Sequence, residues 1–169
     1  MEFSALILLH VFFGIVWAGG AIVAGLFLVP SVMDAGPAGG AVMAGMLKRR
    51  FPMLMTISAA LVVLSGLRLY AMRFSMAFLG TTEGIALTLG GLLGLGAFFI
   101  GSFVQGPTAR RLGALGAQMS AGGSPPTPEQ AAEMQALRTR LGKVATLTAW
   151  HVVLASLLMA GHRLAAMIG

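Results

Sequence analysis

Four long apolar segments follow one another along the chain. They cover residues 3–29, 51–72, 84–104 and 144–168, and few charged side chains interrupt them. A transmembrane helix needs about 20 consecutive apolar residues, so each segment is long enough to cross a bilayer. Pro30 follows the first segment and Gly106-Pro107 follows the third, and we expect both helices to end there. The pattern predicts an all-α integral membrane protein, an up-down bundle of four transmembrane helices in one domain, residues 1–169.

The only long polar stretch lies between the third and fourth apolar segments. It contains the run Ser124-Pro125-Pro126-Thr127-Pro128. Thr127 or Ser124 can cap a helix that begins near Pro128, because proline is tolerated in a first helical turn. Residues 129–143 then have the polar and apolar pattern of an amphipathic helix, which is expected to continue into the fourth crossing. This long connection is predicted to be cytoplasmic.

Composition excludes a water-soluble globule. Hydrophobic residues make up 57% of the 169 residues and charged residues only 9%, against about 25% charged in soluble domains. The chain has no cysteine, which excludes disulfides, thiol catalysis and thiolate metal sites. The few acidic residues lie outside the apolar segments, so no intramembrane carboxylate pair is available for acid–base chemistry. The sequence leaves undecided whether the protein is an enzyme, and this shortage of catalytic groups favours a protein without catalytic activity of its own.

The basic residues predict the orientation in the membrane. One side would hold eight of them: Lys48, Arg49, Arg50, Arg110, Arg111, Arg138, Arg140 and Lys143. The other side would hold three: Arg68, Arg73 and Arg163. Cytoplasmic loops carry the excess of lysine and arginine, so both termini are predicted to face outward from a bacterial inner membrane. Because these charges flank apolar segments, the lipid bilayer is the expected partner and nucleic acid is not.

Small residues recur at four-residue spacing within the apolar segments. The pairs are Gly14 with Ala18, Ala21 with Gly25, Gly90 with Gly94, and Ala97 with Gly101. Such spacing lets membrane helices approach closely. It predicts tight packing of the first and third helices, either within the bundle or against a larger complex or a second copy.

Histidines inside the apolar segments are the main candidates for a functional site, because polar groups in hydrocarbon are costly. His10 and His162 are predicted to lie at the same outer end of two antiparallel helices, with Arg68 and Arg73 nearby. Gly14, one turn from His10, would leave room for a flat group. Two imidazoles and arginines able to bind propionates would suit haem b. The leading hypothesis is therefore a haem b-binding protein for electron transfer or cofactor handling.

Other interpretations stay open. Met72 and Met76, with Met159, His162 and Met167, could offer thioether and imidazole ligands to Cu(I). The histidines could instead hydrogen-bond within a cofactor-free accessory subunit of a larger membrane complex. The roles of His151 and Trp17 are undecided.

The first half of the chain also resembles a known group. Four features carry the resemblance: His10, the run Trp17-Ala18-Gly19-Gly20, the helix exit Leu28-Val29-Pro30 and the later run Ser65-Gly66-Leu67-Arg68-Leu69-Tyr70. Their layout is similar to that of bacterial four-helix membrane proteins of the copper-resistance protein D (CopD) and HemJ-type groups. The resemblance covers residues 5–70. It implies a metal or haem context, with His10 as the position carried over.

Overall fold

The computed structural model describes residues 1–122 and 125–168, except for the side chains of Pro37 and of residues 162–168. Within that part of the chain the structure is almost wholly helical and has no strand. The elements are α1 (Glu2–Val23), η1 (Ala24–Leu28), α2 (Val29–Asp34), α3 (Pro37–Lys48), α4 (Phe51–Arg73), α5 (Met76–Leu79), α6 (Thr82–Ile100), η2 (Gly101–Gln105), α7 (Gly106–Ala121) and α8 (Pro128–Ile168).

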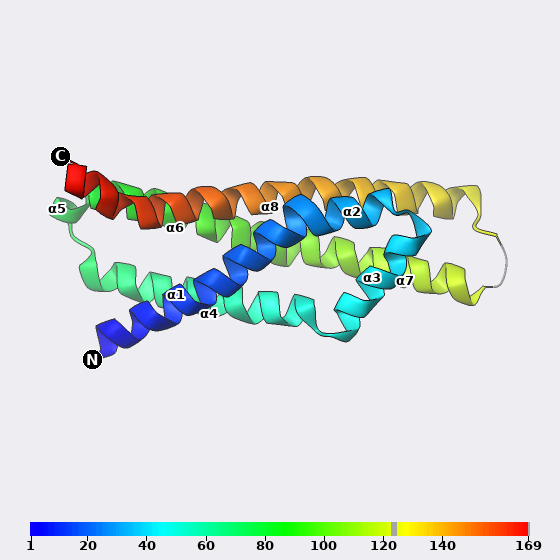
Figure 1. Ribbon diagram of the computed structural model, residues 1–169, viewed down its shortest axis with the longest axis horizontal. Helices are drawn as coiled ribbons and strands as arrows, with labels where there is room; N and C mark the ends of the chain where they lie inside the picture. The colour runs from blue at the N-terminus through cyan, green and yellow to red at the C-terminus, as the bar shows by residue number, and fades with distance from the viewer. Residues whose placement is uncertain (123–124, 169) are drawn as a thin grey trace.

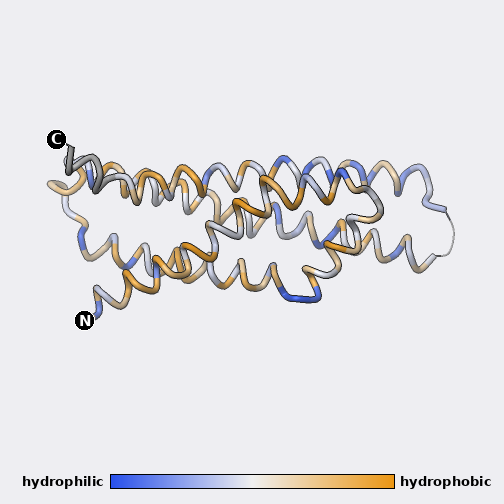
Figure 2. The backbone as a smooth tube through the Cα atoms, in the orientation of Figure 1, coloured by the Kyte–Doolittle hydropathy of each residue, from blue (hydrophilic) through white to orange (hydrophobic). Residues whose placement is uncertain are grey.

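The helices form an elongated bundle with both chain ends at the same end (Figure 1). We call this the terminal end, and the opposite end, which holds α7 and the start of α8, the basic end. Within the described residues, four helical stretches are long and apolar enough to cross a membrane: Glu2–Asp34, Phe51–Arg73, Thr82–Ala121 and Pro128–Gly161. Figure 2 shows that the hydrophilic positions concentrate towards the basic end, while the terminal half is mostly apolar. The expectation of a helical, multi-pass membrane protein is confirmed.

The prediction that Pro30 and Gly106-Pro107 end their helices is wrong, because both helices continue past the proline. A π-helical turn precedes each one: the amide of Val29 bonds to the carbonyl of Ala24, and that of Gly106 to Gly101. Proline lacks an N–H and crowds the preceding turn, and the wider turn takes up that disturbance.

The two connections at the basic end are helical as well. The segment after Pro30, left without structure by the sequence pattern, contains α3. At the basic end, α7 and the start of α8, which extend the apolar parts of the third and fourth helical stretches, form a hairpin in which Arg111 donates to Glu133 at 2.8 Å. This carboxylate raises the pKa of the Arg111 guanidinium. Thr127 caps α8 as predicted, through its hydroxyl on the amide of Gln130. The amphipathic segment continues without a break into the fourth span.

The helices associate as two close pairs, α1 with α4 and α6 with α8, and α1 also crosses onto α8 (Figure 1). Halfway along, a buried layer takes one residue from each helix: Trp17, Ala59, Ala97 and Val152. Three of the four are small or medium-sized, so the Trp17 indole fills the centre of the bundle at this depth.

Only some of the small residues make the close contacts that their spacing predicts. A Cβ at Gly25 would lie 2.5 Å from the carbonyl oxygen of Ala145, and one at Gly90 2.9 Å from Cγ of Met159. By contrast, a Cβ at Gly14, Gly94 or Gly101 would have no atom within 4 Å. Close packing on α8 is therefore concentrated at Gly25 and Gly90.

Candidate functional site: His10 and the terminal-end cavity

His10 lies on α1 and is held by α4. Its Nδ1 lies 3.0 Å from the carbonyl oxygen of Val62 and 3.1 Å from Oγ of Ser65. Ser65 is buried, and its hydroxyl donates to the carbonyl of Leu61 at 2.5 Å. A carbonyl oxygen only accepts, so Nδ1 carries the ring proton and donates it. In the neutral imidazole, Nε2 is then a lone-pair donor.

Gly66 provides the surface on which the imidazole rests. A Cβ at this position would lie 2.8 Å from Cε1 and 3.2 Å from Nδ1 of His10. The ring can therefore reach Val62 only because residue 66 has no side chain. At Gly14, where the sequence predicts room for a flat group beside the ring, a Cβ would have no atom within 4 Å, so this position is open.

His10 lines a cavity of about 390 Å³ at the terminal end, between the α1–α4 and α6–α8 pairs. We call it the terminal-end cavity. Its wall is mostly apolar and includes Trp17, Gly66, Tyr70, Gly91, Gly94 and Met159. The volume lies within the range of about 300–1,000 Å³ that small-molecule sites occupy.

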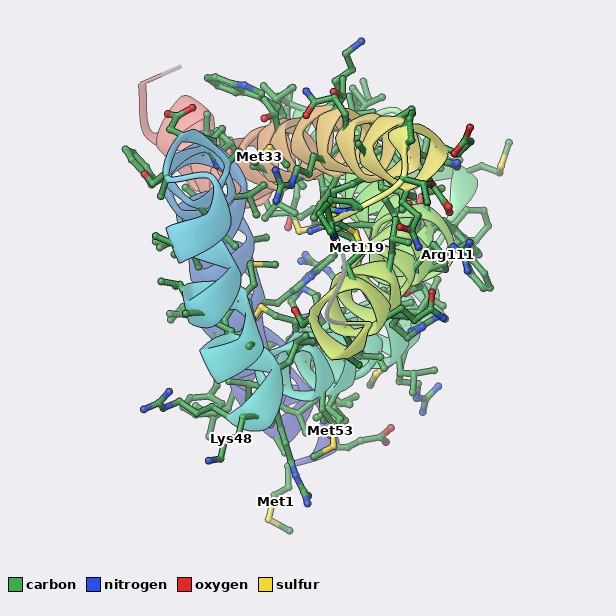
Figure 3. The ribbon with its side chains drawn as sticks, turned by 90° about the vertical axis from the view of Figure 1, so that its right-hand side faces the viewer. Met1, Met33, Lys48, Met53, Arg111 and Met119 are labelled. Atoms are coloured by element: carbon green, nitrogen blue, oxygen red, sulfur yellow. The ribbon has the colours of Figure 1, made fainter. Side chains whose placement is uncertain are left out.

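Trp17 closes this cavity on the side of the bundle centre. It lines the terminal-end cavity and also a second, smaller one of about 170 Å³ that extends towards the basic end. Figure 3 looks along the bundle from that end, where Lys48 and Arg111 project away from the interior. Trp17 is thus a partition between two interior spaces.

Tyr70 and Thr88 join α4 to α6 across the cavity wall. Their hydroxyl oxygens are 2.6 Å apart, and the Thr88 hydroxyl donates to the carbonyl of Gly84, also at 2.6 Å. Since the Thr88 proton is used in that bond, Tyr70 is the donor in the first. The Tyr70 oxygen and Nε2 of His10 are then both acceptors, so these two atoms suit a metal ion or a hydrogen-bond donor.

The two predicted propionate-binding arginines have acidic partners. Arg68 donates through Nε and Nη2 to Glu2 at 3.0 and 2.8 Å, and it does not line the cavity. Arg73 does line it, but forms an ion pair with Glu83 at 2.6 Å and lies over the Phe78 ring. Of the two, only Arg73 is placed at the rim of the site.

The side chain of His162 lies outside the described residues, so its predicted pairing with His10 is not tested. Figure 1 shows the start of α1 beside α4 and diverging from the end of α8. Of the methionines weighed as copper ligands, Met72 and Met76 are exposed at the surface, by 40% and 80%, and do not line the cavity, whereas Met159 does line it. The side chain of Met167 lies outside the described residues.

His151 makes a separate, local arrangement on α8. Its Nδ1 donates to the carbonyl of Leu147 one turn earlier, at 2.9 Å, and the ring edge faces Gly96 of α6. His151 lines neither cavity. These contacts place it in the packing of α8.

Sequence reasoning did not assign Ser65, Gly66, Tyr70 or Thr88 to the site, and it weighed Met159 only as a copper ligand. The available signal was depth: in an antiparallel hairpin, Ser65-Gly66 of the second segment falls opposite His10. Among the residues that the structure describes, no cluster of three histidine or acidic side chains could hold a metal ion. A metal ion bound to His10 would therefore need ligands other than a cluster of described histidine and acidic side chains.

Comparisons with known proteins add no relative: no family model, no curated protein and no solved structure matches this chain.

Proposed function

We propose that this chain is a small multi-pass protein of the bacterial cytoplasmic membrane that binds haem b in the terminal-end cavity and serves electron transfer or cofactor handling. The observation that carries the proposal is the orientation of His10. Its Nδ1–H is fixed by the Val62 carbonyl, which leaves the Nε2 lone pair on a residue that lines the cavity. Histidines that ligate metals almost always donate their other ring nitrogen in this way.

The rest of the terminal-end cavity wall suits a haem group. Gly91 and Gly94 expose bare helix backbone with no atom within 4 Å of a Cβ position, and both line the cavity. A flat macrocycle packs well on such a surface, and Arg73 at the rim could bind a propionate in exchange for Glu83. When bound, the haem would supply one-electron chemistry, and the protein would supply the axial ligand and an apolar, water-poor setting.

The orientation of the bundle belongs to the same proposal. The eight basic residues that the sequence assigns to one side lie on the connections before α4 and between α6 and the apolar part of α8. By the positive-inside rule this end faces the cytoplasm. The terminal-end cavity and both termini would then lie in the outer half of the membrane.

The experiment is a reduced-minus-oxidised visible spectrum of the detergent-purified protein from haem-replete cells. We expect the sharp band pair of a six-coordinate b-type haem in the unsubstituted protein and its loss in His10→Ala. His151→Ala is the matched control, because His151 also lies in a span but lines neither cavity, and it should keep the spectrum. A flat spectrum, or an unchanged one in His10→Ala, would refute the proposal and favour a cofactor-free accessory subunit.

A further inference from the structure

The cavity wall across from His10 carries a second donor of the kind that binds haem iron. Met159 of α8 lines the same cavity. It is seated on Gly90 of α6, where a Cβ would lie 2.9 Å from its Cγ and 3.2 Å from the carbonyl oxygen of Ala155. The position of Met159 is therefore set by the α6–α8 pair, just as that of His10 is set by the α1–α4 pair.

His10 and Met159 lie at the same depth in the bundle. Trp17 of α1 and Val152 of α8 belong to the same buried layer, and the two helices run antiparallel (Figure 1). His10 is seven residues from Trp17, and Met159 is seven residues from Val152, both towards the terminal end. At 1.5 Å per residue, each lies about 10 Å from that layer.

The two donors also approach the cavity from different sides. His10 packs on Gly66 in the α1–α4 pair and Met159 on Gly90 in the α6–α8 pair, and the cavity lies between the pairs. Axial ligands of a haem must come from opposite faces of the macrocycle. A histidine on one helix pair and a methionine on the other meet this requirement.

We infer that Met159 Sδ is the second axial ligand of the haem that His10 binds, in the place that the sequence pattern assigned to His162. The inference rests on the proposed function and specifies its coordination. A thioether opposite an imidazole favours the ferrous state, so such a haem has a higher midpoint potential than one held by two imidazoles. The chain would then accept electrons readily and pass them to a partner of still higher potential.

Near-infrared magnetic circular dichroism of the oxidised, unsubstituted protein distinguishes the two ligand sets, because thioether and imidazole ligation give charge-transfer bands at different energies. We expect the histidine–methionine band. A bis-histidine band would overturn the inference and leave the proposed function standing. A protein without haem would overturn both.

The substitution Met159→Leu tests the same assignment by a second route. Leucine nearly conserves volume, so the helix packing should persist. We expect haem to stay bound through His10, with loss of the thioether band, a five-coordinate high-spin spectrum that responds to carbon monoxide, and a lower midpoint potential. Met72→Leu, at an exposed methionine outside the cavity, should change none of these. A six-coordinate low-spin spectrum retained in Met159→Leu, and lost in His162→Ala, would refute the role of Met159.

Discussion

Replacing Gly66 with alanine should dislodge the His10 ring. The new Cβ would lie 2.8 Å from Cε1, closer than two carbon atoms tolerate, and 3.2 Å from Nδ1, which is tighter than most Cβ contacts. The ring can move away only by lengthening the 3.0 Å bond from Nδ1 to the Val62 carbonyl. The substitution therefore weakens that hydrogen bond and leaves part of the overlap in place.

The expected cost follows from these two contacts. A side-chain hydrogen bond within a membrane protein contributes about 0.6 kcal/mol on average, and overpacking a well-filled interior costs about 1–3 kcal/mol. Alanine in place of glycine within a helix returns roughly 0.5–1 kcal/mol. We expect Gly66→Ala to lower the free energy of unfolding by about 1–2 kcal/mol.

Gly14→Ala is the matched control. Gly14 lies on α1 one turn from His10, and a Cβ there would meet no atom within 4 Å, so only the helix-propensity gain of up to about 1 kcal/mol should appear. Unfolding both variants in mixed micelles with increasing SDS, followed by circular dichroism, gives the difference directly. Equal free energies of unfolding for the two variants would refute the view that Gly66 makes the seat of the imidazole.

Two further predictions concern a serine in the bundle and the start of α8. Ser58 is fully buried, and its Oγ has no hydrogen-bond partner among the described residues. Because an unsatisfied buried hydroxyl costs about 1–3 kcal/mol, Ser58→Ala should stabilise the protein by about 1 kcal/mol in the same SDS titration. Ser65→Ala, which removes hydrogen bonds to Leu61 and His10, should instead destabilise the protein. A loss of stability in Ser58→Ala would contradict the expectation for Ser58. The backbone amide at the helix start and the Thr127 hydroxyl lower the pKa of Glu129. The contribution of the Glu129 carboxylate to the stability of this helix start is therefore full above the usual carboxyl pKa range, and it is lost as the pH falls through and below about 4. The protection factors of the amides in the first turn of α8, taken against intrinsic exchange at each pH, should therefore fall below that pH, and Glu129→Gln should abolish this dependence. An unchanged pH response in Glu129→Gln would show that another group is responsible.

The continuation of both helices past proline shows where local sequence rules stop. Pro30 and Pro107 lack an amide hydrogen, and from sequence alone each indicates a helix end. In the folded bundle η1 packs through Gly25 against α8, with the Thr146 hydroxyl 3.4 Å from the Gly25 carbonyl. Contacts of this kind favour a wider π-turn over a break, and they depend on a partner helix more than a hundred residues away.

The sequence alone determined that this is a helical membrane protein and approximately where its four apolar segments lie, because the cost of placing polar side chains and unpaired backbone groups in hydrocarbon acts locally on each stretch of about 20 residues. It also identified His10, since an isolated imidazole inside such a stretch is visible without any partner. Only the tertiary structure decided what His10 contacts. The Val62 carbonyl and the bare backbone at Gly66 come from α4, and Met159 of α8 lines the same cavity. These placements depend on helix rotation and depth, which apolar composition leaves free.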